Sequence, residues 1–321
     1  MALNLAQLAR FTPVALDLAA PGGTVDWGDL SGLRFAEPFF DETVERWAGG
    51  PAPLLVRTDF ATLEALDAAP SLDPAALIFH MSRCGSTLLS RLLAQLPGTL
   101  VVAEPQPVNT LLTDPATLTE DEAARRLRLL VRALGRRRFG DERHYVLKLS
   151  SWNIARLSLF RRAFPAARLI WVQRAPEAVM ASILADPPGW SQLLGRPALA
   201  ERLFALPAAE LVGLDAAGFC ARALAALLRA ADAAKELMIV DYRELPEAAW
   251  TRVAPAIGLT PGADDIARLR EEAQYDAKAS ERRRFSANRS RRPALPEPLQ
   301  AFVAERLEPL YRRLAARRDA A

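Results

Sequence analysis

Short apolar runs alternate with helix-length amphipathic segments over most of the chain beyond residue 76. Five runs are apolar throughout rather than alternating, namely Leu77 to Phe79, Thr99 to Ala103, Tyr145 to Leu149, Arg168 to Val172 and Leu237 to Val240. Such runs are typical of strands that are buried on both faces of a parallel sheet. The segments between them predict helices over Ser86 to Gln95, Glu120 to Arg138, Ile154 to Phe164 and Ala216 to Glu236. This alternation predicts an α/β fold, a doubly wound parallel sheet flanked by helices.

The first 72 residues do not follow this pattern. They contain many Pro and Gly residues, mixed short segments and a group of aromatic residues at Phe35, Phe39, Phe40 and Trp47. We expect residues 1–72 to form an N-terminal cap whose aromatic side chains pack on an α/β domain of residues 73–321. The alternative is a separate module that binds a substrate.

Composition narrows the class of protein. With 51% hydrophobic and 25% charged residues, the chain resembles an ordinary globular protein, and its net charge of +3 gives no reason to expect a nucleic-acid partner. Its two cysteines, Cys84 and Cys220, are too far apart for a zinc motif, so we expect neither a disulfide scaffold nor a metal. No signal peptide and no apolar run of membrane-spanning length is apparent. We therefore expect a cytoplasmic protein with no membrane partner.

The first predicted strand runs directly into the loop and helix HMSRCGSTLLSRLL, residues 80–93. The first N–H groups of a helix have no partner within it, and they attract phosphate. Gly85 allows close approach of the backbone, and Arg83 adds a forked positive charge. We expect an anion to contact the loop at Ser82, Arg83, Cys84, Gly85, Ser86 and Thr87. The alternative is an ordinary turn in which Ser82 or Ser86 caps the helix.

Spacing argues against two common phosphate chemistries. A nucleoside-triphosphate loop, G-x-x-x-x-G-K followed by Ser or Thr, would need glycine at His80 and lysine at Ser86. A cysteine phosphatase needs five residues between its cysteine and arginine, whereas six separate Cys84 from Arg91. The loop is therefore suited to a phosphate that is held but not hydrolysed, within a P-loop NTPase-like sheet.

Two motifs together resemble the sulfotransferase family that uses 3′-phosphoadenosine 5′-phosphosulfate (PAPS). SRCGSTLLSRLL resembles the 5′-phosphosulfate loop, in the arginine-containing version found in tyrosylprotein sulfotransferases. RLIWVQRAPEAVMAS resembles the 3′-phosphate motif and supplies Arg174 and Ser182 at the family's separation of eight residues. Pro176 suits the first position of the helix that follows. The resemblance implies PAPS as the co-substrate.

Weaker similarities extend the resemblance over residues 77–311. IVDYREL looks like a family segment whose tyrosine lies near the nucleotide, here Tyr242, although Arg243 replaces the usual acidic residue. The basic stretch after Arg282 falls where the family has a loop over the 3′-phosphate, so we expect Arg284 and Arg289 to contact the donor.

The resemblance also implies catalytic roles. Glu104 closes the second predicted strand and fits the general base of the tyrosylprotein branch, while Lys148 fits the lysine that stabilises the leaving group. The alternatives are a structural ion pair between Glu104 and an arginine, and a solvent-facing Lys148. His144 lies at the wrong end of its strand to be the base, and we expect His80 to be a core histidine and Cys84 a turn residue.

The acceptor is not identified by the sequence. It is a hydroxyl or an amine, and residues 186–214 together with the N-terminal cap are expected to form its pocket. Two other functions stay open. One is a nucleotide or metabolite kinase, which would need a loop lysine. The other is a non-catalytic polyanion-binding protein that uses the basic C-terminal run.

Overall fold

A computed structural model describes residues 4–19, 22–113, 118–279, 282–285 and 294–319. These residues contain a five-stranded sheet in which all neighbouring strands are parallel, in the order β5-β6-β4-β7-β8. The strands are β4 (Ala76–His80), β5 (Thr99–Ala103), β6 (His144–Lys148), β7 (Arg168–Gln173) and β8 (Met238–Asp241). The predicted strands begin and end within one residue of these bounds, and the predicted P-loop NTPase-like α/β class is confirmed.

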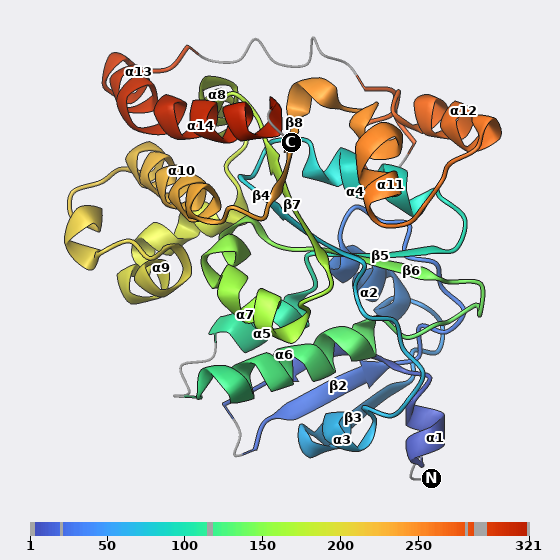
Figure 1. Cartoon of the computed structure of the whole chain (residues 1–321). Helices are drawn as coiled ribbons and strands as arrows, with labels where there is room; N and C mark the ends of the chain where they lie inside the picture. Colours follow the sequence, from blue (N-terminus) through green and yellow to red (C-terminus); the bar gives the residue numbers. More distant parts are fainter. Residues whose placement is uncertain (1–3, 20–21, 114–117, 280–281, 286–293, 320–321) are drawn as a thin grey trace.

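Helices cover both faces of this sheet, with α4 and α11 on one side and α7 and α10 on the other (Figure 1). The α-helices after β4 are α4 (Ser86–Ala94), α5 (Gln106–Thr113), α6 (Glu120–Leu134), α7 (Leu157–Ala163), α8 (Pro176–Ala185), α9 (Pro197–Phe204), α10 (Ala216–Ala233), α11 (Ala254–Ala256), α12 (Ala263–Glu272), α13 (Glu297–Phe302) and α14 (Glu308–Asp319). Short 3₁₀ segments are η1 (Ser151–Arg156), η2 (Gly189–Gly195), η3 (Ala208–Leu211) and η4 (Tyr242–Glu244), and π-helical turns are η5 (Ala249–Val253) and η7 (Val303–Leu307).

Two predicted helices differ from the observed ones for local reasons. The helix expected over residues 120–138 ends at Leu134, because Gly135 passes so close to the preceding chain that a Cβ atom would lie 2.5 Å from the carbonyl oxygen of Leu72. The helix expected from residue 154 is preceded by the 3₁₀ turn η1, where the Ser150 and Asn153 side chains form a reciprocal capping box.

The N-terminal residues form a second, antiparallel sheet that the sequence did not predict. Its strands are β1 (Thr12–Asp17), β2 (Thr24–Gly28) and β3 (Leu55–Asp59), accompanied by α1 (Leu5–Leu8), α2 (Phe40–Ala48) and α3 (Ala61–Ala65). Strand β1 contacts α5 and α6, and the buried Trp27 belongs to the same hydrophobic cluster as the large sheet. This packing suits a cap, and the boundary at residue 72 stays a prediction.

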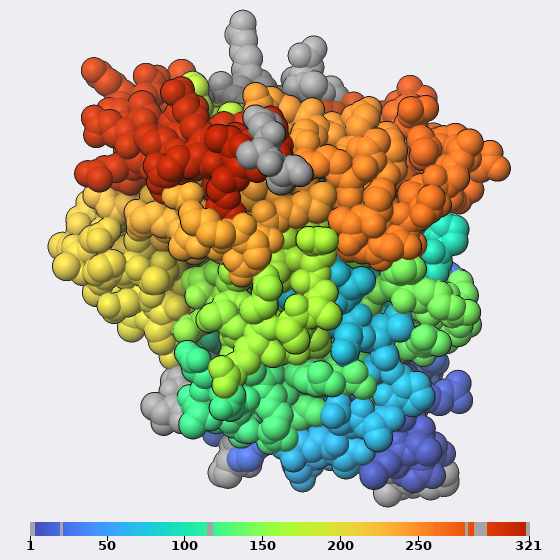
Figure 2. All heavy atoms as spheres, in the orientation of Figure 1, coloured from blue at the N-terminus to red at the C-terminus, as the bar shows by residue number. Residues whose placement is uncertain are grey.

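The carboxyl ends of the parallel strands lie at one edge of the sheet. In open α/β sheets this edge is where ligands bind. The N-terminal sheet lies at the lower end of the molecule in Figure 1, whereas the C-terminal third of the chain, orange and red in Figure 2, covers the upper part. Within the described part of the chain, no helix is long and apolar enough to span a bilayer.

The end of β8 is fixed to the C-terminal helix by a buried hydrogen bond. Asp241 is fully buried and accepts hydrogen bonds from the Tyr311 hydroxyl (2.7 Å) and from Nε of Arg243 (2.9 Å). Burial alone would raise the pKa of this carboxyl, but the hydrogen bonds from Arg243 and Tyr311 hold it below its usual range. The folded state is therefore stabilised by the ionised form of Asp241.

We expect Tyr311→Phe to reduce the free energy of unfolding by about 1.5–3 kcal/mol, because a buried carboxylate loses a donor. Since the pKa of Asp241 is lowered by folding, the loss should be complete at neutral pH and should shrink as the pH falls through the folded-state pKa. Tyr145→Phe is the matched control, because the buried Tyr145 hydroxyl has no hydrogen-bond partner among the described residues. Urea unfolding measures both variants, and an equal loss in Tyr145→Phe would contradict this account.

Candidate active site

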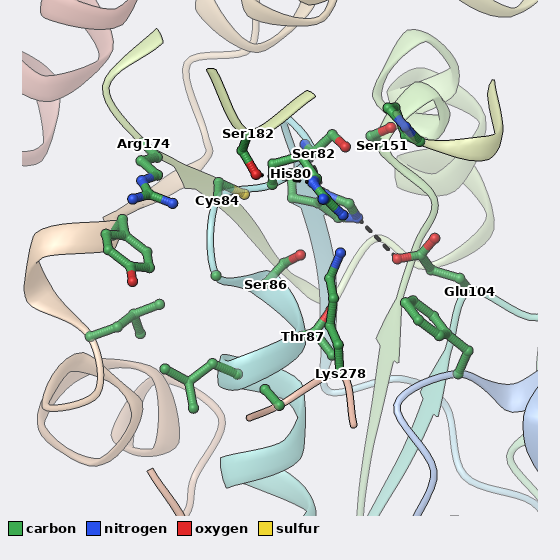
Figure 3. A pocket seen from close by; sticks show the side chains of 18 of the residues that line it. His80, Ser82, Cys84, Ser86, Thr87, Glu104, Ser151, Arg174, Ser182 and Lys278 are labelled. Atoms are coloured by element: carbon green, nitrogen blue, oxygen red, sulfur yellow. Dashed lines mark hydrogen bonds and ion pairs between the residues drawn. The ribbon is translucent and has the colours of Figure 1, made fainter. Parts of the chain in front are cut away.

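A large pocket lies at the carboxyl ends of the strands (Figure 3). Its volume is about 780 Å³. Every strand of the sheet contributes to its lining at or just beyond its end, through His80, Glu104, Ser150, Arg174 and Tyr242. This volume lies within the range of about 300–1,000 Å³ that is typical of small-molecule sites.

The β4–α4 loop has an unusual backbone. Ser82 (φ 72°), Arg83 (φ 51°) and Gly85 (φ 88°) are all left-handed. Such turns aim successive N–H groups into one concavity and make anion-binding nests. Of the described non-glycine residues, Ser82, Arg83, Glu104 and Ala205 have positive φ, and the first three line this pocket. Strained backbone that gathers in one pocket marks a functional site.

The start of α4 is open to a ligand. Gly85 occupies its N-cap position, and no side chain caps the helix, so the alternative of a turn capped by Ser82 or Ser86 is not what the structure shows. Ser86 and Thr87 are buried in the first turn and line the pocket. The free N–H groups and the helix dipole together favour a phosphate here.

The two predicted anion-binding segments meet in this pocket. The Arg83 Nε group donates to the Ser182 hydroxyl at 3.2 Å, which joins the β4–α4 loop to α8. Arg83 also forms an ion pair with Asp186 at the end of α8. Arg174 follows β7, and its guanidinium carbon lies 4.1 Å from the ring centre of Tyr242. Arg174, Ser182 and Tyr242 thus surround one end of the pocket.

Glu104 and Lys148 form an ion pair at the ends of β5 and β6, in which Lys148 is fully buried and Glu104 is half-buried. Glu104 is left-handed (φ 51°), and its N–H donates to the carbonyl of Lys148 at 2.7 Å. The Lys148 side chain is fully buried, lies 5.0 Å from the ring centre of Phe39 and does not line the pocket itself. Glu104 therefore pairs with a lysine rather than an arginine, and Lys148 does not face solvent.

The ionisation of Glu104 follows from its neighbours. Burial alone would raise the pKa of this carboxyl, but the charge of Lys148 and the contact with His80 hold it well below its usual range. Glu104 is consequently ionised at neutral pH, with its carboxylate facing the pocket (Figure 3). The lowered pKa also makes this carboxylate a weaker base than an unpaired glutamate.

His80 belongs to this cluster, which the prediction of a core histidine did not foresee. It is buried, but its Nδ1 atom accepts from the N–H of Ser82 (3.0 Å), and its Nε2 atom lies 3.4 Å from Oε1 of Glu104. Burial lowers the pKa of the imidazole, so the ring is neutral and carries its proton on Nε2. His80 thus links the loop to the carboxylate.

Cys84 is placed as a turn residue. Its thiol is fully buried and donates to the carbonyl of Val172 at 3.1 Å. Burial raises the pKa of Cys84 to about 11, so the thiolate required of a nucleophile is scarce at neutral pH.

Some site residues were missed by the sequence, and some predicted ones lie elsewhere. Phe39 of the N-terminal segment and Lys278 after α12 both line the pocket. The only signal for Lys278 is that lysine is rare in this chain, and Phe39 was noted only as part of an aromatic group. Arg284 pairs with Tyr275 through the backbone and is not part of the lining, while Arg289 lies outside the described residues. The described residues contain no group of three or more His, Cys, Asp or Glu that could hold a metal.

Three solved structures of bacterial proteins align with this chain. The sulfotransferase STF9 from Mycobacterium avium is 18% identical, with 77% of this chain and 78% of that chain aligned and a TM-score of 0.45. STF1 from Mycobacterium tuberculosis is 16% identical, with 79% of each chain aligned and a TM-score of 0.44. A sulfotransferase from Alicyclobacillus acidocaldarius is 18% identical, with 77% of this chain and 96% of that chain aligned and a TM-score of 0.38.

No family model and no curated protein matches the sequence. All three aligned structures are named as sulfotransferases, the family that the two motifs of this chain resemble. The similarity is distant, so the chemistry of the site has to be inferred from the residues of this chain.

Gly85→Ala should distort the loop. A Cβ atom there would lie 2.8 Å from the Tyr242 ring and 2.9 Å from the Leu245 side chain, at a φ that alanine adopts poorly. We expect a loss of about 1–3 kcal/mol in the free energy of unfolding, measured with urea. Gly189→Ala is the control, because a Cβ atom at this other lining residue meets nothing within 4 Å. Equal effects of the two substitutions would refute a special role for Gly85.

Proposed function

We propose that this chain transfers a sulfuryl group from PAPS to a hydroxyl or amine acceptor. The observation that carries the proposal is the arrangement of two anion-binding segments around one pocket. The β4–α4 loop and the Arg174–Ser182 segment surround it, and an ionised Glu104 faces it from the end of β5. Figure 3 shows Arg174 and Glu104 on opposite sides of the loop.

The pocket suits the two charged ends of PAPS. The N–H groups of the left-handed loop and the uncapped start of α4 would hold the 5′-phosphosulfate. Arg174 and Ser182 would hold the 3′-phosphate. The forked guanidinium of Arg174 can donate two parallel hydrogen bonds to one phosphate group. Tyr242, stacked on Arg174, would then lie beside the nucleoside.

The transfer would proceed by in-line displacement at sulfur. The acceptor oxygen or nitrogen forms a bond to sulfur while the bond between sulfur and the 5′-phosphate oxygen breaks. The acceptor proton passes to Glu104, and the products are a sulfated acceptor and adenosine 3′,5′-bisphosphate. As in phosphoryl transfer, the protein contributes positioning and charge stabilisation rather than covalent chemistry.

Two alternatives are less well supported. A kinase would need a lysine in the loop, where Ser86 stands. A polyanion-binding surface would need unneutralised arginines, and within the described part of the basic run Arg282 pairs with Glu271 and Arg283 with Asp276, while Arg289, Arg291 and Arg292 lie outside the described residues. The cytoplasmic location and the lack of nucleic-acid or membrane partners stay predictions.

Adenosine 3′,5′-bisphosphate should raise the melting temperature. At a concentration of 100 times its Kd, a ligand that binds only the folded state stabilises it by about 2.7 kcal/mol. Arg174→Ala should abolish the thermal shift because the 3′-phosphate loses its main cation. Arg312→Ala on the exposed face of α14 is the control and should retain it. Absence of any shift for the unmodified chain at millimolar ligand would contradict the proposed donor site.

Glu104→Gln should reduce turnover of sulfur-labelled PAPS by about 10²–10⁴-fold, the usual contribution of a general base. Glutamine retains the size and an oxygen of the side chain but leaves the charge of the buried Lys148 uncompensated, so the variant should also be less stable, and bisphosphate binding under the assay conditions shows that it is folded. Glu271→Gln, on the surface beside Arg282, is the control. The acceptor is first found by screening candidate alcohols, phenols and amines. Unchanged turnover in Glu104→Gln would rule out its role as the base.

A further inference from the structure

Lys278 reaches the pocket from a segment distant in sequence from both motifs. It lies beyond α12 and between Tyr275 and Arg284 in the sequence, two residues whose backbones form an isolated antiparallel bridge, and it lines the pocket. In Figure 3 its side chain runs past Thr87 toward the space between Ser86 and Glu104. Arg174 stands on the far side of the loop in the same view. The ammonium of Lys278 is thus at the Glu104 end of the pocket.

The other cations at this end are already paired. Arg83 forms its ion pair with Asp186, and the buried Lys148 forms one with Glu104. Among the residues that the structure describes, the ammonium of Lys278 has no hydrogen bond or ion pair. Burial and the charge of Arg83 lower the pKa of Lys278. Lys278 is nevertheless exposed, and an unpaired ammonium that lines the pocket beside other cations is stabilised by a bound anion.

Arg91 fixes this segment to α4. Its Nη1 atom donates to the carbonyls of Ala277 (3.4 Å) and Ala279 (3.2 Å), on either side of Lys278. Its Nη2 atom bonds Glu272 at 3.0 Å, and both side chains of this pair are mostly buried. Because α4 also provides the anion-binding loop at its start, Arg91 holds Lys278 at a set position relative to that loop.

We propose that Lys278 binds the sulfuryl oxygens of the donor and that Arg91 is its positioning residue. The proposal rests on the proposed function and assigns to Lys278 the contact with the transferred group. Lys148 is fully buried and paired with Glu104. In this proposal it does not contact the sulfuryl group but keeps the carboxylate of Glu104 ionised and in place. As charge moves onto the sulfuryl and bridging oxygens during transfer, a nearby ammonium stabilises it.

The test compares two ligands that differ in the sulfuryl group. Titration calorimetry gives Kd for PAPS and for adenosine 3′,5′-bisphosphate on the unmodified chain, on Lys278→Met and on Lys235→Met. Lys235 is an exposed lysine that bonds only the carbonyl of Asp232, so it serves as the control. Lys278→Met should weaken PAPS binding by about 10-fold or more, the equivalent of one charged hydrogen bond, and bisphosphate binding by less than about 3-fold.

The outcomes separate this proposal from the proposed function. If the unmodified chain binds neither ligand, both fail. If it binds both ligands and Lys278→Met weakens neither, or weakens both equally, the assignment of Lys278 to the sulfuryl group is wrong while the donor site stands.

Arg91→Ala tests the positioning role by a double-mutant cycle. Arg91→Ala should lose PAPS affinity selectively, as Lys278→Met does, and the double variant should be no weaker than Lys278→Met alone. Losses that add, or an equal loss for the bisphosphate, would show that Arg91 acts on the fold and not through Lys278.

Discussion

The buried pair of Glu104 and Lys148 determines how the site is built. Ala103 and Lys148 are register partners on adjacent parallel strands, so the residue after β5 and the last residue of β6 are brought together by the sheet itself. Removing one partner from a buried pair leaves an uncompensated charge and is strongly destabilising. The pair therefore fixes the left-handed turn at Glu104, and Glu104 in turn lies against the proton on Nε2 of His80.

This pairing determines which cations remain for a ligand. Lys148 does not line the pocket, and its positive charge keeps Glu104 ionised. On the proposed function, positive charge for an anionic donor would then come from other elements, namely the β4–α4 loop, the residue after β7 and the segment after α12. In this arrangement the proposed base, Glu104, lies at one end of the pocket with Lys278, and the proposed 3′-phosphate site at Arg174 lies at the other end.

The sequence predicted the part of the site that lies on regular elements. Strands buried on both faces have a clear hydrophobic signature, and each strand end then locates its neighbouring polar residue, as for Glu104 and Arg174. Lys278 and its anchor Arg91 could not be predicted, because the path of residues 273–279 depends on tertiary hydrogen bonds that no local pattern encodes. The N-terminal sheet was missed because its strands, TPVALD, TVDWG and LVRTD, mix polar with apolar residues and form no continuous apolar run.

The central claim is that one adenosine nucleotide spans the two anion-binding segments. A crystal structure of the chain with adenosine 3′,5′-bisphosphate tests it most directly. We predict the 5′-phosphate on the N–H groups of residues 83–87 and the 3′-phosphate on Arg174 and Ser182, with Glu104 facing the free 5′ end. A nucleotide bound in the reverse direction, or outside this pocket, would contradict the account.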